Sequence, residues 1–361
     1  MAFEALASLL VAEPRLLDVL GLTPMQKAMW SLSAGAWHGI ARADLFFTND
    51  GIVAAEINCD TPTGEPEAVT LSRLAATDHG HSDPNRLFRE RFLAMVDVLA
   101  RRERDPSAAP ARTVGLVYPT ELSEDLSLIR LYRSWFEGSG LEVVLGSPHN
   151  LDFDRGRTVL FGTPIDVLFR HYKTDWWGER SSAWRTSTVR DDPPLSGPLR
   201  AVAAGVLSGS LAVVNPFGAV AIQNKRALSL LWEQIHRFPS DVQTAIERYV
   251  PLTRRLEVMH AEQLLAQQRE WVIKSDYGAE GEEVYVGREV TEATWREVVA
   301  EAKPDRWVAQ RYFAAESTAR GEQVNYGVFL LGGAAAGLFT RVQRGATNGQ
   351  ARSAATLVDV R

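Results

Sequence analysis

The sequence predicts a mixed α/β fold, of the α+β kind, with two or three packed subdomains. Three observations carry this prediction. The chain has 361 residues, which is more than one hydrophobic core usually organises. Segments of strand length alternate with a helical segment over 113–170, which is typical of a parallel sheet. Further strand-like segments follow residue 270, after a strongly helical stretch over 221–270.

The composition is that of a soluble globular protein and argues against nucleic-acid binding. Hydrophobic residues make up 45% and charged residues 23% of the chain, which are ordinary values. The formal net charge is -6, and no run of Lys and Arg accompanies aromatic residues as a nucleic-acid footprint would require. The single cysteine, Cys59, excludes an internal disulfide and suits a reducing cytoplasm, where we expect the protein to function.

No segment of the sequence predicts membrane insertion. The N-terminal stretch 1–20 is apolar but carries acidic residues and lacks a basic start, so it predicts an amphipathic helix rather than a signal peptide. The most apolar stretch, 201–222, is interrupted by Gly205, Gly209 and Pro216, and within it 211–214 predicts a short buried strand. We therefore expect no membrane partner.

The segment 1–100 is predicted to form helices followed by a β-hairpin. Two strand-like runs, ADLFFT and IVAAEIN, flank the turn signal NDG. Antiparallel pairing around this turn brings the start of the first strand beside the end of the second. Arg42 and Asp44 share one face, as do Glu56 and Asn58, because residues two apart in a strand point the same way. The hairpin therefore predicts four polar groups at one end of a sheet, although solvated strand ends are the commoner explanation for any one of them.

The segment 113–215 is predicted to form an α/β unit. It follows a linker rich in Pro, Ala and Arg at 101–112, which is the best candidate for a domain boundary. Its strands are predicted from TVGLVYP, LEVVLGSP, RTVLFG and IDVLFRHY, and its helix from LSEDLSLIRLYRSWFEGSG. The stretch 175–198 predicts an irregular loop, either a substrate lid or a packed loop.

The segment 216–361 contains two patterns that favour a nucleotide site. A strand ending in Lys274 is followed by a glycine-containing loop, which could close over phosphates with its backbone N–H groups. The spacing is not that of a Walker A loop, and a plain hairpin with an exposed lysine is the commoner alternative. A strand at 306–313 could form the hinge of an adenine pocket, or simply a buried strand. Thr291 is the expected N-cap of the helix between these two strands.

These motifs together resemble the glutathionylspermidine synthase family, whose synthetase domain is a circularly permuted ATP-grasp fold. The family pattern R-x-D, then E-x-N leading into D-T-P, is matched with its spacing. Further matches are NKRALSLLWE, with Asn224 and Lys225, and KSDYGAEG, which corresponds to the family's phosphate loop. The resemblance runs in order from about residue 25 to about residue 345. The matching residues of the first pattern are Arg42, Ala43, Asp44, Glu56, Ile57, Asn58, Asp60, Thr61 and Pro62.

The resemblance implies roles for individual residues. Asp44, Glu56 and Asn58 are implied to hold Mg²⁺, and Arg42 to act in catalysis by facing the γ-phosphate and the acyl intermediate. Thr61 and Glu124 are implied to contact substrate. The implied ATP-binding residues are Lys225, Lys274, Glu280, Gly281, Gln310, Arg311, Tyr312, Phe313 and Arg341.

The implied division of the chain has three parts. Residues 1–100 contribute helices and the metal-binding hairpin to the ATP-grasp core, 113–215 form a preATP-grasp-like substrate subdomain, and 216–361 form the nucleotide-binding subdomains.

The resemblance implies an ATP- and Mg²⁺-dependent carboxylate-amine ligase. ATP phosphorylates a carboxylate of a small molecule or short peptide, and an amine then attacks the acyl phosphate. The sequence departs from the family pattern at Ser275, Ala279 and Val342, so the identities of acid and amine stay open. Two alternatives also stay open, namely a phosphotransferase with the same nucleotide site and an inactive ATP-binding regulatory protein. A homodimer is a reasonable expectation. Cys59 is expected to be a buried, inert thiol that points away from Glu56 and Asn58.

Overall fold

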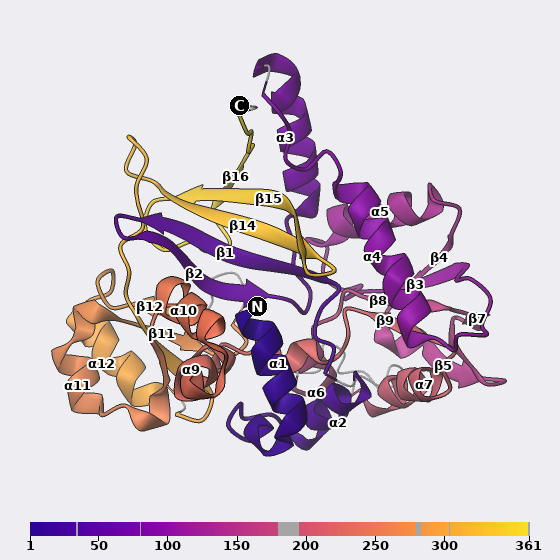
Figure 1. Ribbon diagram of the computed structural model, residues 1–361, viewed down its shortest axis with the longest axis horizontal. Helices are drawn as coiled ribbons and strands as arrows, with labels where there is room; N and C mark the ends of the chain where they lie inside the picture. Colours follow the sequence, from indigo (N-terminus) through magenta and orange to yellow (C-terminus); the bar gives the residue numbers. More distant parts are fainter. Residues whose placement is uncertain (34, 80, 180–194, 279–282, 303, 360–361) are drawn as a thin grey trace.

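The computed structural model describes residues 1–33, 35–79, 81–179, 195–278, 283–302 and 304–359 (Figure 1). Within these residues the strands form four sheets with helices packed around them. The protein therefore has the mixed α/β architecture that the sequence predicts.

The main sheet is built from both ends of the chain, in the order β16-β15-β14-β1-β2 (Figure 1). All neighbouring strands in it are antiparallel. The predicted hairpin is confirmed, and Gly51 supplies the positive φ of its turn. A β-bulge between Asp44 and Leu45 bends the hairpin beside the polar pairs. The strands are β1 (Ile40–Thr48), β2 (Gly51–Asn58), β14 (Gln323–Leu331), β15 (Ala334–Gln343) and β16 (Arg352–Ala354).

A second, smaller sheet has the order β10-β13-β11-β12 and is also antiparallel. Two helices pack on it, and Trp295 fills the space between them and Ile273. The predicted N-cap is confirmed, because the Thr291 side chain accepts a hydrogen bond from the backbone N–H of Thr294. The elements are β10 (Thr253–Arg255), α11 (Ala261–Ala266), β11 (Trp271–Ser275), β12 (Val284–Val286), α12 (Glu292–Glu301) and β13 (Trp307–Arg311).

A third sheet is parallel and has the order β4-β3-β8-β9. Its strand β3 is buried along its whole length, as expected of a parallel strand covered on both faces. Aromatic rings from two helices, including Phe92 and Tyr132, pack against Phe169. The elements are α4 (Phe88–Glu103), β3 (Thr113–Val117), α5 (Leu126–Glu137), β4 (Glu142–Gly146), β8 (Val167–Arg170) and β9 (Ala212–Val214).

The prediction that RTVLFG joins the parallel sheet is wrong. This segment forms β6, the middle strand of a separate antiparallel sheet in the order β5-β6-β7. The links on either side of β6 are too short for a parallel crossover, so its neighbours run antiparallel. The strands are β5 (Leu151–Asp154), β6 (Arg157–Leu160) and β7 (Thr163–Pro164).

The remaining helices complete the cores. The helix predicted over 1–20 is confirmed only for its first part, α1, which packs on α9 and α10; it ends at Ala12 because Pro14 disfavours helical backbone at the residue before it. The predicted loop at 175–198 begins within helix α6 and ends within helix α7, and 180–194 lie outside the described residues. The α-helices are α1 (Ala2–Ala12), α2 (Pro24–Leu32), α3 (Glu65–His79), α6 (Thr174–Glu179), α7 (Ser196–Leu207), α8 (Ala219–Gln223), α9 (Arg226–Glu233) and α10 (Ser240–Tyr249). The 3₁₀ turns are η1 (Pro14–Leu17), η2 (Pro148–Asn150), η3 (Ile235–Arg237), η4 (Leu256–Val258) and η5 (Gln268–Glu270).

Two further findings bear on the predicted organisation. Among the described helices, none combines the length and the apolar character needed to cross a membrane. Because the main sheet joins 40–58 to 323–354, the first and last parts of the chain share one layer. The predicted boundaries near 101–112 and 215 stay a prediction.

Candidate active site

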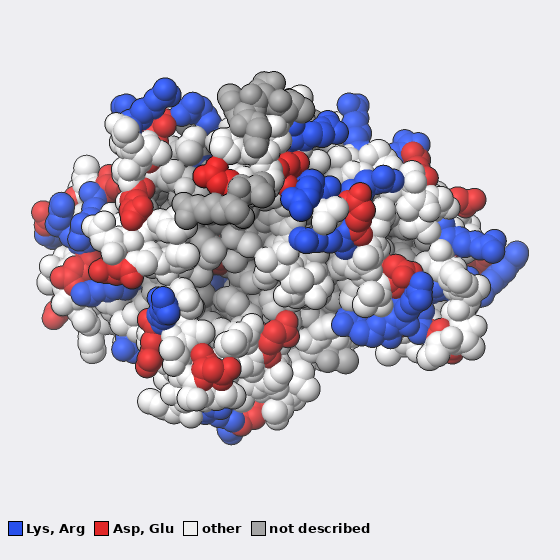
Figure 2. Space-filling model, turned by 45° about the horizontal axis from the view of Figure 1, so that its top comes forward, with Lys and Arg blue, Asp and Glu red and all other residues white. Residues whose placement is uncertain are grey.

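A cavity of about 710 Å³ opens between the main sheet and the second sheet. Its walls come from β1, β2, β14 and β15 on one side and from β11, β12 and β13 on the other, with loops closing the ends. Figure 2 shows one face of the molecule, on which basic and acidic side chains are intermingled rather than gathered in one large field. The predicted site residues that line the cavity are Arg42, Asp44, Glu56, Asn58, Thr61, Glu124, Lys274, Gln310, Tyr312, Phe313 and Arg341.

The hairpin register places the four predicted polar groups in two adjacent pairs. Asp44 lies directly opposite Glu56, and Arg42 lies directly opposite Asn58. Directly opposed residues of antiparallel strands project to the same face. The Nδ2 of Asn58 lies 3.5 Å from Oε1 of Glu56, at the limit of a hydrogen bond. The juxtaposition predicted from the NDG turn is therefore present.

Arg42 is held firmly at the floor of the cavity. Its Nε donates to Oδ1 of Asp44 at 2.8 Å, and its Nη1 donates to the carbonyl oxygen of Thr63 at 2.6 Å. Burial opposes the charge, but the adjacent Asp44 carboxylate raises the pKa of Arg42. Gly327 on the neighbouring strand leaves room for the side chain, because a Cβ there would lie 2.6 Å from Cδ of Arg42.

Asp44 is the centre of the charged cluster. Its Oδ2 accepts a hydrogen bond from Nη2 of Arg341 at 2.7 Å, from Nη2 of Arg42 at 3.3 Å, and from Nδ2 of Asn325 at 3.4 Å. Burial acts to raise the pKa of Asp44, but Arg42 and Arg341 outweigh it and hold that pKa below its usual value. The carboxylate therefore stays ionised although only 2% of the residue is exposed.

Two lysines approach the same carboxylates from other elements. Nζ of Lys274 donates to Oε1 of Gln310 at 2.8 Å within the cavity wall. Burial lowers the pKa of Lys274 to about 8; Glu56 acts in the opposite direction, and the Lys225 charge adds to the lowering. Lys225 does not line the large cavity, but its Nζ donates to the carbonyl oxygen of Gly278 at 2.6 Å and lies 3.7 Å from Oε2 of Glu56. Four cationic side chains thus surround Asp44 and Glu56, and this excess of positive charge suits a polyanion.

The predicted adenine hinge is only partly in the cavity wall. Gln310, Tyr312 and Phe313 line it, but the Arg311 side chain does not. Arg311 instead forms an ion pair with Glu270 at 2.5 Å and lies over the Trp271 ring, outside the cavity. The physical reason is strand alternation: if Gln310 points inward, its neighbour on β13 must point outward. Glu280 and Gly281 lie outside the described residues.

The far end of the cavity carries the predicted substrate residues Thr61 and Glu124. It also carries a pair that the sequence did not predict, in which Nε2 of His171 lies 3.2 Å from Oδ2 of Asp125. His171 is 5% exposed and follows β8, whereas Asp125 precedes α5. Neither the spacing nor the local pattern of these residues links them, so only the fold could reveal the pair.

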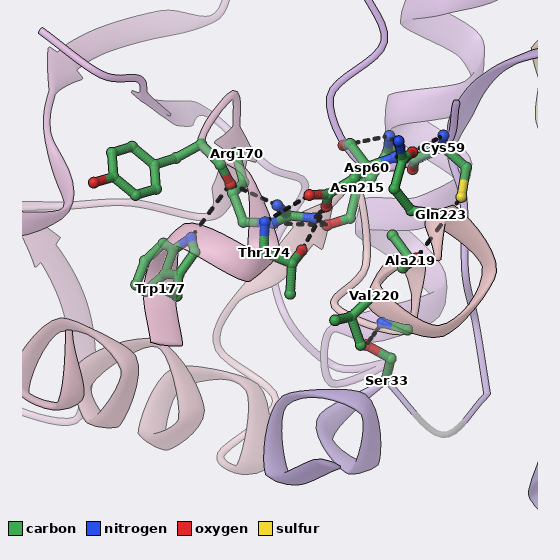
Figure 3. Close-up of polar contacts among 12 residues, drawn as sticks. Ser33, Cys59, Asp60, Arg170, Thr174, Trp177, Asn215, Ala219, Val220 and Gln223 are labelled. Atoms are coloured by element: carbon green, nitrogen blue, oxygen red, sulfur yellow. Dashed lines mark hydrogen bonds and ion pairs between the residues drawn. The ribbon is translucent and has the colours of Figure 1, made fainter. Parts of the chain in front are cut away.

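Asp60 anchors the chain segment next to Thr61 through a set of buried hydrogen bonds (Figure 3). Its carboxylate accepts hydrogen bonds from Nη2 of Arg170 and from the backbone N–H of Thr174, each at 2.5 Å. Nδ2 of Asn215 donates to the carbonyl oxygens of Cys59 and Asp60, at 2.9 and 3.0 Å. The chain that carries Thr61 is thereby attached to the parallel sheet and to α6. The DTP motif signalled the position of Asp60, but its partners are too distant in sequence to predict.

The expectation for Cys59 is confirmed. The residue is fully buried, and burial raises the pKa of its thiol well above the usual value. Its Sγ faces the carbonyl oxygen of Ala219 at 3.8 Å, away from the cavity.

The donor set around Asp44 fits a hard cation such as Mg²⁺. Carboxylate and amide oxygens are the protein ligands that Mg²⁺ prefers, and it usually takes only one or two carboxylates and leaves other positions to phosphates and water. Asp44, Glu56 and Asn58 provide such a set on two paired strands. In the part of the chain that the structure describes, no group of three or more His, Cys, Asp or Glu residues forms a separate all-protein metal site.

Comparisons with known proteins bear on the family and the fold. A family model described as glutathionylspermidine synthase preATP-grasp matches residues 2–356. A crystal structure of a gamma-glutamylcysteine synthetase-like protein from Methylobacillus flagellatus KT matches with a TM-score of 0.55 and 14% identity, covering 96% of this chain and 87% of the other. At this sequence identity the similarity is evidence for the fold alone.

Two further results complete the comparisons. A RimK domain ATP-grasp protein from Sphaerobacter thermophilus DSM 20745 matches with a TM-score of 0.33 and 17% identity, covering 68% of this chain and 90% of the other. A search of curated protein sequences found no match.

Proposed function

The chain belongs to the glutathionylspermidine synthase preATP-grasp family, and from this premise we propose how its cavity carries out ligation. Membership makes the protein an ATP-dependent ligase with an ATP-grasp-like fold. The proposal concerns the finer points: which residues bind ATP, which hold the metal ion, and how an acid and an amine are joined. The observation that carries it is that Lys274 and Arg341, from the last third of the chain, share one cavity with the hairpin residues Arg42, Asp44 and Glu56.

ATP would lie between the two antiparallel sheets. The excess positive charge around Asp44 and Glu56 supports placing the triphosphate there, with Lys225, Lys274 and Arg341 as its partners. Tyr312 and Phe313 line the same cavity beyond Gln310 and offer ring faces for an adenine. The cavity is large enough to hold a nucleotide together with part of a second substrate.

Asp44, Glu56 and Asn58 would hold the Mg²⁺ ion that accompanies ATP. When bound, Mg²⁺ neutralises phosphate charge and orients the β- and γ-phosphates. The fit rests on the paired hairpin positions and on the ionised state of Asp44.

The first step transfers the γ-phosphoryl group to the substrate acid. A carboxylate oxygen attacks the γ-phosphorus, the bond from that phosphorus to the β–γ bridging oxygen breaks, and ADP leaves. Arg42 would face the γ-phosphate in this step. Two partners, Asp44 and the Thr63 carbonyl, fix its guanidinium before substrate arrives. Such preorganised charge costs no rearrangement when negative charge develops in the transition state.

The second step forms the amide. The amine nitrogen attacks the acyl carbon, the bond from that carbon to the phosphate oxygen breaks, and inorganic phosphate leaves while the nitrogen gives up one proton. His171 lies on the wall beside Thr61 and Glu124 and is a group able to take that proton. A protein nucleophile is not needed, since ATP activates the acid.

The test is ADP release that requires two substrates. Purified protein is incubated with ATP and Mg²⁺, with amino acids or short peptides as acids and with polyamines and other amines as acceptors. Hydroxylamine replaces the amine in a parallel assay, because it converts an acyl phosphate to a hydroxamate. We expect ADP release, and product, only when an acid is combined with an amine or with hydroxylamine. ADP release with a single small acceptor would favour a phosphotransferase, and nucleotide binding without ADP release would favour an inactive protein.

Variants of the hairpin test the metal and nucleotide assignment. Asp44→Ala and Glu56→Ala should abolish turnover of ATP with Mg²⁺ while circular dichroism shows an intact fold. Asp50→Ala is the matched control, because Asp50 is exposed at the tip of the same hairpin and should leave turnover unchanged. Unchanged ADP production in either of the first two variants would remove the metal assignment.

A further inference from the structure

Asn325 lies on the same face of the main sheet as the predicted metal residues. On β14 it is paired with Arg341 of β15, and its position two residues from Gly327, the partner of Asp44, puts it on the cavity face. It lines the cavity and is 2% exposed. On this face Asn325 therefore lies diagonally across from Asp44 and directly opposite Arg341.

The amide of Asn325 is only half satisfied. Its Nδ2 donates a long hydrogen bond of 3.4 Å to Oδ2 of Asp44, the oxygen that also accepts from both arginines. Its carbonyl oxygen, Oδ1, is buried and has no hydrogen-bond partner among the described residues. A buried acceptor without a donor is unfavourable. The position therefore suits a ligand that is bound through this oxygen when the protein works.

We propose that Asn325 is a further oxygen ligand of the divalent cation held by Asp44, an inference that rests on the proposed function. The ion would lie between a carboxylate oxygen of Asp44 and the amide oxygen of Asn325, from two neighbouring strands. Turning the amide about its last side-chain bond presents Oδ1 to the space beside Oδ2 of Asp44. Without a cation that orientation sets two oxygens against each other, so the NH₂ group faces Asp44 instead.

A cation explains the unsatisfied atom better than a phosphate does. Oδ1 is an acceptor, and phosphate oxygens are acceptors as well, so they cannot satisfy it. Donors for phosphate are already present in Arg42 and Arg341, so Oδ1 of Asn325 adds nothing to a phosphate site. Amide and carboxylate oxygens together are what a hard divalent cation prefers.

The experiment measures Mn²⁺ binding to the full chain, with ADP present, by the electron paramagnetic resonance signal of free Mn²⁺. Neither substrate of the ligation is needed. Asn325→Ala should weaken Mn²⁺ binding by roughly tenfold or more, the size of effect seen when a metal site loses a supporting group. Asn325→Asp should strengthen it several-fold, because ligand charge raises affinity for a hard cation. Opposite effects of the two substitutions separate ligation from general damage, which would weaken binding in both.

Control variants distinguish a metal-ligand role of Asn325 from other causes of weaker Mn²⁺ binding. Gln323→Ala removes a polar side chain two residues away on the same strand and face, and should leave the Mn²⁺ affinity unchanged. Glu56→Gln should weaken binding if the proposed metal site is right. If Glu56→Gln weakens Mn²⁺ binding and Asn325→Ala does not, Asn325 is not a ligand and the proposed function stands. If Mn²⁺ does not bind even the unmodified protein with ADP, both the metal site of the proposed function and this inference are overturned. If Asn325→Ala weakens binding of metal-free ADP equally, Asn325 contacts the nucleotide and the inference is overturned.

Discussion

One buried carboxyl group, Glu65, should make the folding stability of this protein depend on pH. Its side chain is 0% exposed and accepts a hydrogen bond from the Tyr132 hydroxyl at 2.9 Å, while its Oε2 has no partner among the described residues. Burial raises the pKa of Glu65 from 4.5 to about 8, although its own backbone N–H, Tyr132 and Arg42 act in the other direction. The folded protein therefore keeps a proton on Glu65 that the unfolded chain has already lost.

The sign and size of the effect follow from linkage. Between pH 4.5 and about pH 8 the folded state binds more protons than the unfolded state, so stability falls as pH rises through this window. The slope is at most about 1.4 kcal/mol per pH unit, and the whole window amounts to an upper limit of about 5 kcal/mol. Glu65→Gln preserves the shape and cannot ionise. We expect it to remove the contribution of Glu65 to this slope, and to stabilise the protein by several kcal/mol near pH 8 but hardly at all near pH 4.5.

Urea unfolding followed by tryptophan fluorescence over this pH range provides the assay, since the chain contains ten tryptophans. Tyr132→Phe is the control, because it removes the hydrogen-bond donor but keeps the carboxyl group and must therefore keep the slope. A weaker slope of the same sign should persist in Glu65→Gln, because burial also raises the pKa of Glu103. Parallel stability curves for the unmodified protein and Glu65→Gln would refute the reasoning.

Three other predictions concern the site and its surroundings. Gly327→Ala places a Cβ 2.6 Å from Cδ of Arg42, so it should lower the free energy of unfolding by about 1–3 kcal/mol. Because the Cβ also moves the guanidinium, the rate of ADP release should fall roughly a hundredfold. Unfolding and turnover assays measure the two effects, and a normal turnover rate would contradict the prediction. The affinity for an ATP analogue should fall as pH rises through about 8, where Lys274 loses its proton, and titration calorimetry of Lys274→Met should show that this fall has disappeared. Cys59 should resist thiol reagents in the native protein and react only at the rate of unfolding, so rapid labelling under native conditions would contradict its burial.

The parts of the fold that the sequence predicted well are those fixed by local pattern. The hairpin followed from a turn signal between two alternating strands, and its register alone brought Asp44 beside Glu56. The differences from the predictions also have local causes. The Arg311 side chain faces away from the cavity, because adjacent residues of one strand face opposite sides, and its assignment to the adenine hinge stays a prediction. RTVLFG was counted as a parallel strand, although the short links around it allow only antiparallel neighbours.

What the sequence could not predict depends on packing between distant segments. His171 and Asp125 meet because β8 and the start of α5 lie together at one end of the parallel sheet, and no spacing in the chain encodes that contact. Asn325 resembles any other polar residue of an alternating strand until its neighbours are known. Only the packing of β14 beside β1 shows that its Oδ1 is buried without a hydrogen-bond donor among the described residues.

The main sheet has a consequence for how the protein is made. Asp44 and Arg341 are 297 positions apart, so the hairpin leaves the ribosome long before the strands that flank it. Until those strands arrive, one edge of the hairpin has no hydrogen-bonding partner, and its charged residues lack their counterparts. Nascent chains should therefore be unable to bind ATP productively, and competence should appear only once synthesis is nearly finished. A premature stop anywhere before β14 would thus yield an inert product rather than a partly active one.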